Sequence, residues 1–506
     1  MPTPPRISKQ RSPKNLPTHL HLHPQPHHRL PSRLHIERHP RHDPPQLIAQ
    51  RLKHRTKPLR HRPRHAIPSR KIYTDPIATN PNPRIFLSAG EASGDHYGAQ
   101  IIAELHTRHP HLTTFGLGGR EMEHAGLHRI VCAEDVAHMG ITEVIRHTPR
   151  VYGAYRRLVA SIKKQRPSAA ILIDFPDVNF RLARELKKLN IPIIYFVSPQ
   201  LWAWKRSRLR WVQQRVDRML VIFPFEAAFY RNRNVNAEFV GHPLAELPLP
   251  TISREQFAAT YMFANREDPQ SSSHISRPWM ALLPGSRWKE VESNLPTMLE
   301  AAALLGPNYD FLIPVASTLD KQVFSNFVFQ ETLPRIQWPK SSITLVPDAR
   351  EALHHARASI VASGTATVQA AVIGNPFIVV YKVSPLTFRL AKRLIRYPAE
   401  IWPDNQPDAD GNLPIAMVNL IAGRRIVPEL LQQNFTAEKV AAALRPLLAD
   451  TPKRHQMIAD LAEVRRALQP TESSPEKTAI QRVCDAVESL LPHQTPARDP
   501  NPTTNV

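Results

Sequence analysis

Apolar residues follow two alternating patterns along most of the chain. From about residue 84 onward, short continuous apolar runs are separated by longer segments whose apolar positions recur at helical spacing. The continuous runs predict strands buried on both faces, and the longer segments predict helices. The predicted strands are 85–87, 169–173, 191–197, 219–223, 279–283, 309–313, 343–346, 359–362 and 377–381. This alternation is typical of parallel sheets with helices on both faces, so we predict an α/β fold.

Breaks in the alternation predict the domain organisation. A proline-rich stretch at 241–250 separates two series of strands and helices, and a helical run near 437–491 follows the second series. We therefore predict two doubly wound domains, then C-terminal helices and a short disordered tail. The expected ranges are 84–245, 246–425, 426–492 and 493–506. The uncharged stretch 358–381 is long enough to cross a bilayer. However, Gly374 and Pro376 interrupt it, so we interpret it as strand, turn, helix, turn and strand.

Residues 1–83 have a different composition. They carry +14 of the chain's net charge of +23 and have no apolar periodicity. Such a segment cannot bury enough surface to offset the entropy of ordering, so we predict a disordered basic tail without the apolar core of a signal peptide. It is either an arm for nucleic acid or a membrane, or sequence upstream of the true translation start. The charge therefore does not define the function of the folded part.

The number of cysteines limits the kinds of cross-link and metal site that the chain could contain. Cys132 and Cys484 are the two cysteines of the chain, which is too few for a disulfide framework or a zinc cage. A reducing compartment is the default for such a chain.

The loop after the first predicted strand is rich in glycine and small residues. Such a loop lets a ligand approach the backbone and presents helix N-terminal amides to an anion, although glycines there also serve the geometry of the turn alone. The candidate residues are Gly90, Glu91, Ser93, Gly94 and Asp95.

Two later loops of the first domain also carry candidate chemistry. Asp174 lies at the carboxyl end of a predicted strand, where ligands bind in open α/β sheets, and it could act as a general base. The alternative role is a helix cap, for which we favour Asp177 because it follows Pro176. Trp202 and Trp204 suit stacking on a sugar or acyl chain, or anchorage at a membrane interface. Their alternative is a hydrophobic cluster that closes the domain.

In the second domain, loops 284–287 and 363–367 each follow a strand and open a helix. The guanidinium of Arg287 and the amides and hydroxyls of the second loop would together form an anion site. Neither loop ends in Gly-Lys-Ser/Thr, which argues against a P-loop that binds a nucleoside triphosphate. No Gly-x-Gly-x-x-Gly follows a strand, which argues against a dinucleotide-binding site. No His, Asp or Glu cluster has metal-ligand spacing, so we expect neither a metal nor a cofactor.

The segment 140–162 combines an apolar helical stripe with many arginines and lysines. A helix that faces the core is the usual interpretation, but the density of basic residues also fits contact with anionic lipid. The apolar residues expected at the membrane are Ile141, Val144, Ile145 and Val151.

Taken in order, these motifs closely resemble those of the lipid-A-disaccharide synthases, the bacterial glycosyltransferases of lipid A assembly. The resemblance runs from about residue 84 to the C-terminal helices. The matching strings are Ala89–Asp95, Met139-Gly140, Glu143-Val144, Ile173-Asp174, Pro176-Asp177, Ser198-Pro199, Trp202–Trp204, Phe223–Glu226, Phe239–His242, Leu282–Arg287, Ser363–Thr367, Asn419–Arg424 and Val427–Gln432.

The resemblance implies two Rossmann-like domains of GT-B type that face a cleft, with a C-terminal helix crossing back to the first domain. It implies inverting transfer of 2,3-diacylglucosamine from UDP to the 6-hydroxyl of 2,3-diacylglucosamine 1-phosphate, with no metal or cofactor. Because both substrates are acylated, it also implies a cytoplasmic enzyme, peripheral on the anionic inner membrane surface of a Gram-negative type bacterium. It implies no specific nucleic-acid partner and leaves a homodimer open.

The resemblance also assigns residues. Asp174 matches the family's essential aspartate and is the expected general base. The expected donor-site residues are Ser286, Arg287, Ser363, Gly364, Thr365, Gln369, Asn419, Arg424 and Glu429. The expected acceptor-side residues are Gly90, Glu91, Ser93, Gly94, Asp95, Trp202 and Trp204. The chain departs from the family at Gln369, where a glutamate is usual near the ribose hydroxyls, and in the segment 397–417, which is longer than usual.

Two alternatives stay open at this point. One is another two-domain UDP-sugar enzyme, such as a UDP-N-acetylglucosamine 2-epimerase or a different glycosyltransferase. Trp202, Trp204 and the basic amphipathic segment favour a lipid substrate over a soluble one. The other is a nucleic-acid-binding protein, which only the positive charge indicates.

Overall fold

The computed structural model describes residues 83–137, 144–262, 276–336, 342–470 and 476–491. For residues 144–150 it describes the helical backbone and not the side chains. The predicted tails at 1–83 and 493–506 lie outside these ranges, apart from Pro83.

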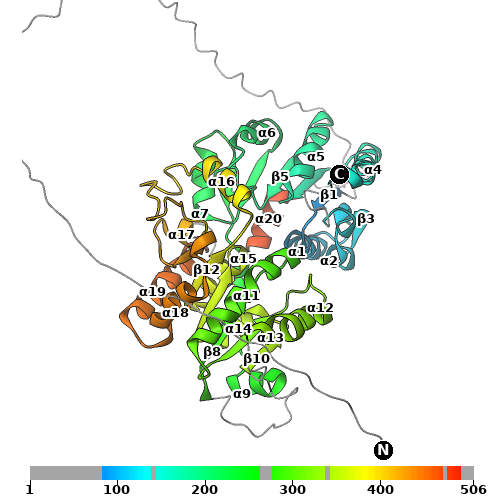
Figure 1. The fold of residues 1–506 in the computed structure, drawn as a ribbon. Coiled ribbons are helices and arrows are strands. Elements are labelled where there is room, and N and C mark those ends of the chain that lie inside the picture. The colour runs from blue at the N-terminus through cyan, green and yellow to red at the C-terminus, as the bar shows by residue number, and fades with distance from the viewer. Residues whose placement is uncertain (1–82, 138–143, 263–275, 337–341, 471–475, 492–506) are drawn as a thin grey trace, which may run out of the picture. The chain divides into compact units, whose positions relative to one another are not determined.

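Two parallel sheets organise the described residues (Figure 1). The first has the strand order β3-β2-β1-β4-β5-β6-β7 and the second the order β10-β9-β8-β11-β12-β13. The strands of the first sheet are β1 (Arg84–Ala89), β2 (Thr113–Gly118), β3 (Leu127–Cys132), β4 (Ala169–Ile173), β5 (Ile193–Phe196), β6 (Arg218–Val221) and β7 (Ala237–Phe239). Those of the second are β8 (Trp279–Leu283), β9 (Asp310–Pro314), β10 (Ile343–Val346), β11 (Ala358–Ala362), β12 (Phe377–Tyr381) and β13 (Glu429–Leu431).

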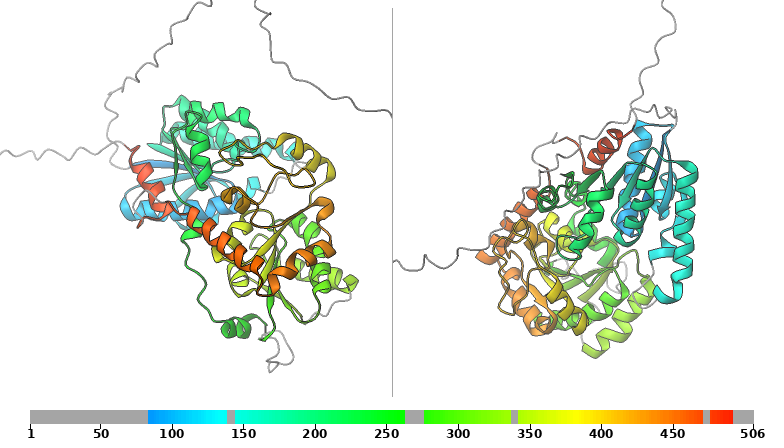
Figure 2. Two further views of the ribbon diagram at one scale, coloured as in Figure 1. Left: turned by 90° about the vertical axis from the view of Figure 1, so that its left-hand side faces the viewer. Right: turned by 90° about the horizontal axis from the view of Figure 1, so that it is seen from above.

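Helices connect the strands and cover both faces of each sheet, as Figure 2 shows. The helices of the first half are α1 (Ala92–Arg108), α2 (Arg120–His124), α3 (Glu134–Ala137), α4 (Val144–Gln165), α5 (Pro176–Lys188), α6 (Leu209–Arg215), α7 (Pro224–Arg231) and α8 (Pro243–Glu246). Those of the second half are α9 (Arg254–Phe257), α11 (Trp288–Leu305), α12 (Lys321–Asn326), α13 (Leu333–Ile336), α14 (Ala349–His355), α15 (Thr365–Ile373), α16 (Pro385–Leu394) and α17 (Met417–Ala422). The C-terminal helices are α18 (Ala437–Leu448), α19 (Pro452–Ala467) and α20 (Ala479–Glu488).

The strand order places the predicted loops together. In the first sheet the order reverses between β1 and β4, which pair in parallel, and in the second it reverses between β8 and β11. Ligands bind outside the carboxyl ends of the strands at such a reversal. The loops that begin at Gly90, Asp174, Pro284 and Ser363 follow these four strands. The topology therefore brings all four candidate loops to the two reversal points.

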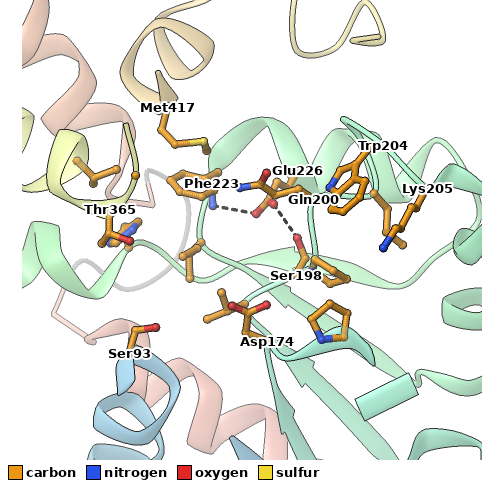
Figure 3. Close-up of a pocket in the computed structure, with 18 of the residues that line it drawn as sticks. Ser93, Asp174, Ser198, Gln200, Trp204, Lys205, Phe223, Glu226, Thr365 and Met417 are labelled. Carbon is orange, nitrogen blue, oxygen red and sulfur yellow. Dashed lines mark hydrogen bonds between the residues drawn. The ribbon is translucent and has the colours of Figure 1, made fainter. Parts of the chain in front are cut away.

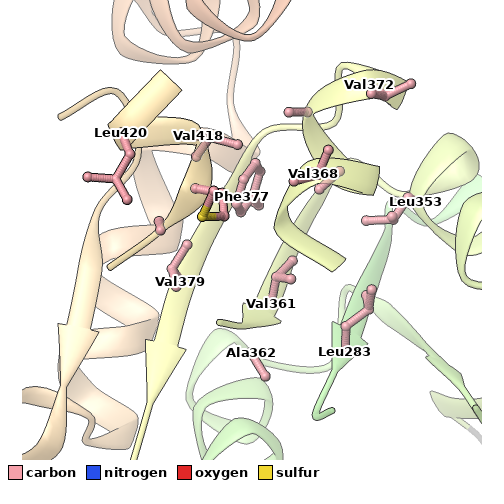
Figure 4. Packing of buried hydrophobic residues seen from close by; sticks show 14 of the residues in the cluster. Leu283, Leu353, Val361, Ala362, Val368, Val372, Phe377, Val379, Val418 and Leu420 are labelled. Carbon is pink, nitrogen blue, oxygen red and sulfur yellow. The ribbon is translucent and has the colours of Figure 1, made fainter. Parts of the chain in front are cut away.

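The central strands are buried along their whole length because helices pack on both faces. Every residue of β4, β8 and β11 is buried, which agrees with their continuous apolar sequences. In the second half, Val368 of α15 and Val418 of α17 lie over Phe377 and Val379 of β12 (Figure 4). This packing fixes the position of α15, whose first turn reaches the site described below.

The last helix returns to the first sheet, as expected. α20 packs on α1, and its Val483 and Val487 are buried with Leu87 and Ile171 of the first sheet. Arg108 at the end of α1 donates to Asp485 at 2.7 Å and to Glu488 at 3.2 Å. The C-terminal helix thus covers one face of the N-terminal sheet (Figure 2).

The second sheet extends beyond its expected boundary at residue 425. β13 pairs with β12, with Glu429 opposite Val379, so its residues belong to the second sheet. α18 packs on α11, and α19 packs on α15 and α17. The segment 426–492 is therefore divided between the two halves of the molecule and is not a separate layer of helices.

Candidate active site

A cavity of about 380 Å³ lies at the carboxyl ends of β4, β5 and β6 and is closed on one side by the start of α15 (Figure 3). Its lining residues are Ser93, Tyr97, Asp174, Pro176, Asp177, Val197, Ser198, Pro199, Gln200, Leu201, Trp204, Lys205, Arg208, Ile222, Phe223, Glu226, His242, Gly364, Thr365, Val368 and Met417. Five of the expected site residues are among them: Ser93, Asp174, Trp204, Gly364 and Thr365.

The backbone at Asp174 is held in a strained conformation. Asp174 and Phe175 have φ angles of 43° and 46°, in the left-handed region that side-chain-bearing residues rarely adopt. The buried amide of Asn179 lies 2.8 Å from the carbonyl oxygen of Asp174, and the hydroxyl of Tyr195 donates to the same oxygen at 2.6 Å. Ser88 in turn donates to Asn179 at 2.6 Å. Strain that is fixed so firmly is typical of functional sites.

The carboxyl group of Asp174 is poised to accept a proton near neutral pH. Burial raises its pKa from 3.8 to about 7, and the negative charge of Glu91 acts in the same direction. A hydrogen bond from the backbone at Phe175 opposes both effects. A carboxyl with a pKa near the working pH is suited to general-base chemistry.

Asp177 does not cap the following helix, contrary to our expectation. The N-cap position of α5 is Phe175, and Asp177 lies within the first turn. Its carboxylate instead forms an ion pair with Arg208 at 2.7 Å, on the wall of the cavity.

Glu226 anchors the loop that forms the far wall. One of its carboxylate oxygens accepts hydrogen bonds from Ser198 at 2.6 Å and from the indole of Trp202 at 3.0 Å. The other accepts from the amide of Phe223 at 3.2 Å. Burial raises the pKa of Glu226 to about 7, although these hydrogen bonds oppose the shift.

The two tryptophans of this loop have different environments. Trp202 is 1% exposed, packs in the core against Phe225 and Tyr397 and does not line the cavity. Trp204 lines the cavity, is 44% exposed and carries the ammonium of Lys205 4.2 Å from its ring centre. Of this pair, Trp204 is the one available for stacking.

The glycine-rich loop after β1 divides into structural and cavity-lining residues. A Cβ on Gly90 would lie 2.4 Å from the ring of Phe175 and would force a shift, whereas one on Gly94 would lie 3.2 Å from Ala89, a tight contact. Asp95 is buried, accepts hydrogen bonds from three backbone amides around the start of α2 and does not line the cavity. Ser93 lines the cavity.

The donor-side residues reach the cavity through α15. Gly364 has a φ of 148°, which glycine adopts readily, and its neighbourhood leaves open space above the backbone. The start of α15 lines the cavity at Gly364 and Thr365, where a helix has N–H groups without partners inside the helix. Ser363 immediately precedes them, and Gln369 lies one turn further along the same helix, half-buried.

Arg287 and Ser286 stand at the edge of the site and do not line the cavity. The Arg287 side chain is 71% exposed and lies 3.3 Å from Glu290 and 3.9 Å from Glu91 of the first half. Ser286 is fixed by its backbone, whose carbonyl accepts from Thr318 at 2.6 Å. The exposed guanidinium thus lies between carboxylates of the two halves at the edge of the site.

Three of the expected donor-site residues have structural environments instead. Asn419 is fully buried and its amide oxygen accepts from the amides of Ile426 and Val427. Glu429 accepts from Asn419 and from two backbone amides at the start of α17. Arg424 is paired with Asp460 and Glu463 of α19. These contacts join β13 to its neighbouring helices, and none of the three residues lines the cavity itself.

Several cavity residues were not assigned a role from the sequence. Lys205 and Arg208 bring positive charge to the wall, and the basic run after Trp204 was a usable signal for them. Burial lowers the pKa of His242 to about 4, so this ring is neutral at physiological pH. Its Nδ1 accepts from the amide of Leu244, which makes it a helix cap.

The expected membrane residues lie mostly outside the described side chains. Ile141 is outside the described residues, and for Val144 and Ile145 the structure describes only the backbone of α4. Val151 is half-buried, and further along the helix Leu158 and Ile162 are buried in the core. Within the described parts of the chain, no helix is long and apolar enough to cross a membrane.

Comparison with known proteins identifies the family. The family model described as lipid-A-disaccharide synthetase matches residues 85–483. The lipid-A-disaccharide synthase of Acidobacterium capsulatum is 51% identical over 417 residues, which are 81% of this chain and 96% of that protein. The enzyme of the same name from Koribacter versatilis is 46% identical over 400 residues, or 78% and 97% of the two chains.

A solved structure supports the fold alone. The kitacinnamycin glycosyltransferase has a TM-score of 0.50 at 14% identity, and the match covers 81% of this chain and 100% of that protein. Together with the family match and the two parallel sheets, these findings lead to one conclusion. The chain belongs to the lipid-A-disaccharide synthase family, the glycosyltransferases of lipid A biosynthesis.

Proposed function

We propose that this enzyme transfers 2,3-diacylglucosamine from UDP to the 6-hydroxyl of 2,3-diacylglucosamine 1-phosphate with inversion at the anomeric carbon. In this reaction the 6-oxygen forms a bond to the anomeric carbon while the bond to the diphosphate oxygen breaks. The hydroxyl proton passes to a base, and UDP leaves with the electron pair. The observation that carries the proposal is Asp174, a cavity-lining carboxyl whose pKa is raised to about 7.

Asp174 is the general base of the proposed reaction. Its backbone is fixed by Asn179 and Tyr195, so the carboxylate is held in place before the substrates bind. Such prior positioning lowers the entropic part of the barrier. A single displacement with one base gives inversion, because the acceptor attacks from the face opposite the leaving group.

The first turn of α15 and Arg287 stabilise the departing diphosphate. Amides at a helix N-terminus carry partial positive charge and bind phosphate oxygens. The Arg287 guanidinium adds a charge-assisted contact from the edge of the site. Negative charge develops on the diphosphate as the bond breaks, so both contacts strengthen in the transition state.

Lys205 and Arg208 receive the 1-phosphate of the acceptor. Both side chains line the cavity on the wall next to Trp204, on the first half of the molecule. Two cations there match the acceptor's dianionic phosphate, and the exposed face of Trp204 suits its sugar or the start of an acyl chain.

The direct test uses the full chain with UDP-2,3-diacylglucosamine and 2,3-diacylglucosamine 1-phosphate in detergent. Mass spectrometry should detect the disaccharide 1-phosphate, and proton coupling at the new anomeric centre should report the β configuration. A parallel incubation with UDP-N-acetylglucosamine alone tests for epimerisation. Epimer without disaccharide would overturn the proposal.

A further inference from the structure

α16 exposes a row of leucines to solvent. Leu386, Leu390 and Leu394 are 78%, 56% and 55% exposed. They are four residues apart, so they form one continuous stripe along this helix of ten residues. Large side chains of this kind scatter singly over most protein surfaces, whereas a contiguous stripe indicates a contact surface.

The opposite side of α16 is less exposed than the leucine stripe. Phe388, Ala391 and Ile395 lie on the opposite face and are half-buried against the protein. The hydroxyl of Ser384 caps the first turn by accepting from the amide of Thr387. The two apolar faces of α16 therefore have different functions, one in packing and one directed outward.

Basic residues border the stripe. Arg389 and Arg393 are exposed beside the leucines, and Lys382 and Arg396 are exposed near the two ends of the helix. Residues 382–396 contain no aspartate or glutamate. Lys392 lies towards the protein, where it donates to the carbonyl oxygen of Asp410 at 2.7 Å. The stripe therefore has arginines along one side, and the charged side chains of residues 382–396 are all positive.

The C-terminal end of α16 joins the loop that lines the cavity. The amide of Arg396 donates to the carbonyl oxygen of Ala203 at 3.4 Å, and Arg206 bonds to the carbonyl oxygen of Arg396. Trp204 lies between these two contact points in the sequence and is part of the cavity wall. The segment that follows α16 also contacts the first half, because Glu400 pairs with Arg233, just after α7, at 3.0 Å.

We propose that the leucine stripe of α16 inserts into the surface of an anionic bilayer, with Arg389 and Arg393 at the lipid headgroups. An apolar stripe bordered by arginine and lysine is the composition of helices that lie in a membrane interface. Charge decides against two other occupants. A second copy placed by a two-fold axis would bring the positive borders together, and the segment 1–83 is itself strongly positive.

The surface has a role in the proposed reaction, and this part of the inference rests on the proposed function. Insertion of α16 would bring the Trp204 side of the cavity to the membrane. Acylated substrates could then enter without their chains leaving the bilayer, so that the apolar chains are never exposed to water.

Vesicle flotation of the full chain tests the surface. The vesicles are phosphatidylglycerol mixed in equal parts with phosphatidylcholine, with pure phosphatidylcholine for comparison. The triple variant Leu386→Ser, Leu390→Ser, Leu394→Ser should bind the anionic vesicles at least about tenfold more weakly than the wild type. The double variant Arg389→Gln, Arg393→Gln should bind the anionic vesicles about tenfold more weakly than the wild type. Raised salt should reduce this difference in affinity between the variant and the wild type.

A matched control uses apolar side chains of similar exposure elsewhere. Leu304 and Val323 are 47% and 51% exposed on α11 and α12, and Leu304→Ser, Val323→Ser should bind vesicles like the wild type. Equal vesicle binding by the triple variant and the wild type would overturn the inference. A wild-type dimer in sedimentation velocity that dissociates in the triple variant, without any loss of vesicle binding, would assign the stripe to a second copy instead.

Activity in detergent separates this inference from the proposed function. With both substrates in micelles, the triple variant should retain wild-type transfer, because α16 contributes no cavity-lining residue. If the triple variant binds vesicles more weakly as expected but the wild type makes no disaccharide, the proposed function is wrong and the membrane surface on α16 is supported. If disaccharide forms and the vesicle result fails, the surface alone is wrong.

Discussion

The two walls of the cavity are built on different principles. The first half contributes Asp174, whose backbone carbonyl oxygen accepts from Asn179, and the buried Glu226, whose carboxylate accepts from Ser198 and Trp202. The second half contributes the backbone of α15 and the exposed side chain of Arg287. A buried carboxylate costs stability and must be positioned in advance, whereas a helix terminus is a ready anion site. Substitutions should therefore alter chemistry on the first wall and donor affinity on the second.

The largest effect should come from Asp174→Asn. Loss of a general base typically slows a reaction by about 10²–10⁴-fold, so kcat should fall by this amount while UDP affinity stays near the wild-type value. A continuous UDP-release assay measures kcat, and titration calorimetry with UDP measures the UDP affinity. Asp404→Asn serves as the control, since Asp404 is exposed and does not line the cavity. Full activity in a folded Asp174→Asn protein would remove Asp174 from this role.

The same variant should be more stable than the wild type, with a defined pH dependence. The pKa of Asp174 is about 7 in the folded protein against an ordinary 3.8, so the folded state holds a proton that the unfolded state has released. Wild-type stability therefore falls as the pH rises from about 4 to about 7. Asparagine has no proton to lose, so Asp174→Asn should gain on the order of 1–3 kcal/mol above pH 7 and nothing below pH 4. Urea unfolding at both pH values measures the difference.

On the second wall, Arg287→Ala should weaken UDP binding by about 10–100-fold, the size of a lost charge-assisted contact. The acceptor's KM should change little, because Arg287 lies on the donor side. Calorimetry with UDP gives the affinity, and Lys289→Ala on the same helix is a control for the removal of a nearby positive charge. Unchanged UDP affinity in Arg287→Ala would contradict the assignment.

The fold followed from the apolar pattern wherever strands were long and continuous. Four strands escaped it for identifiable reasons. β2 contains two glycines, β3 is interrupted by the adjacent polar residues His128 and Arg129, and β7 and β13 have three residues each. Such short or mixed segments form strands because neighbouring strands supply hydrogen bonds, and a single sequence does not reveal those neighbours.

Only part of the candidate site could be predicted from the sequence, because tertiary contacts decide the environment of the other residues. Asp174 and the loop at Gly364 follow long strands directly, so their place at the edge of the sheets could be inferred. Asn419, Glu429 and Trp202 have polar or aromatic groups that a motif alone would give to substrate, yet these groups bond to the protein itself. Only the tertiary contacts distinguish the two uses.

A smaller effect is expected for Glu226→Ala. The change leaves the buried donors of Ser198 and Trp202 without their acceptor, which should cost about 1–3 kcal/mol of unfolding free energy. The control is Glu238→Ala, whose carboxylate pairs with Arg218 near the surface and should contribute less than about 1 kcal/mol. Urea unfolding monitored by tryptophan fluorescence measures both. Equal stability of the two variants would show that Glu226 does not anchor this wall.

The smallest effect should come from Glu91→Gln, which acts across the two walls. The negative charge of Glu91 raises the pKa of Asp174 less than burial does, and Glu91 lies 3.9 Å from Arg287. Removing the charge should lower the pKa of the base, so the acidic limb of the pH–rate profile should move to lower pH with kcat at its plateau nearly unchanged. The loss of a partner should also leave Arg287 freer for the diphosphate, so UDP affinity should rise by less than about tenfold, as expected for one exposed pair.

The profile of kcat/KM between pH 5 and pH 9 measures the shift, with Glu290→Gln as the control because Glu290 pairs with Arg287 from its own helix. An unmoved acidic limb would mean that Glu91 and Asp174 do not interact in the working enzyme, and that the two walls act independently.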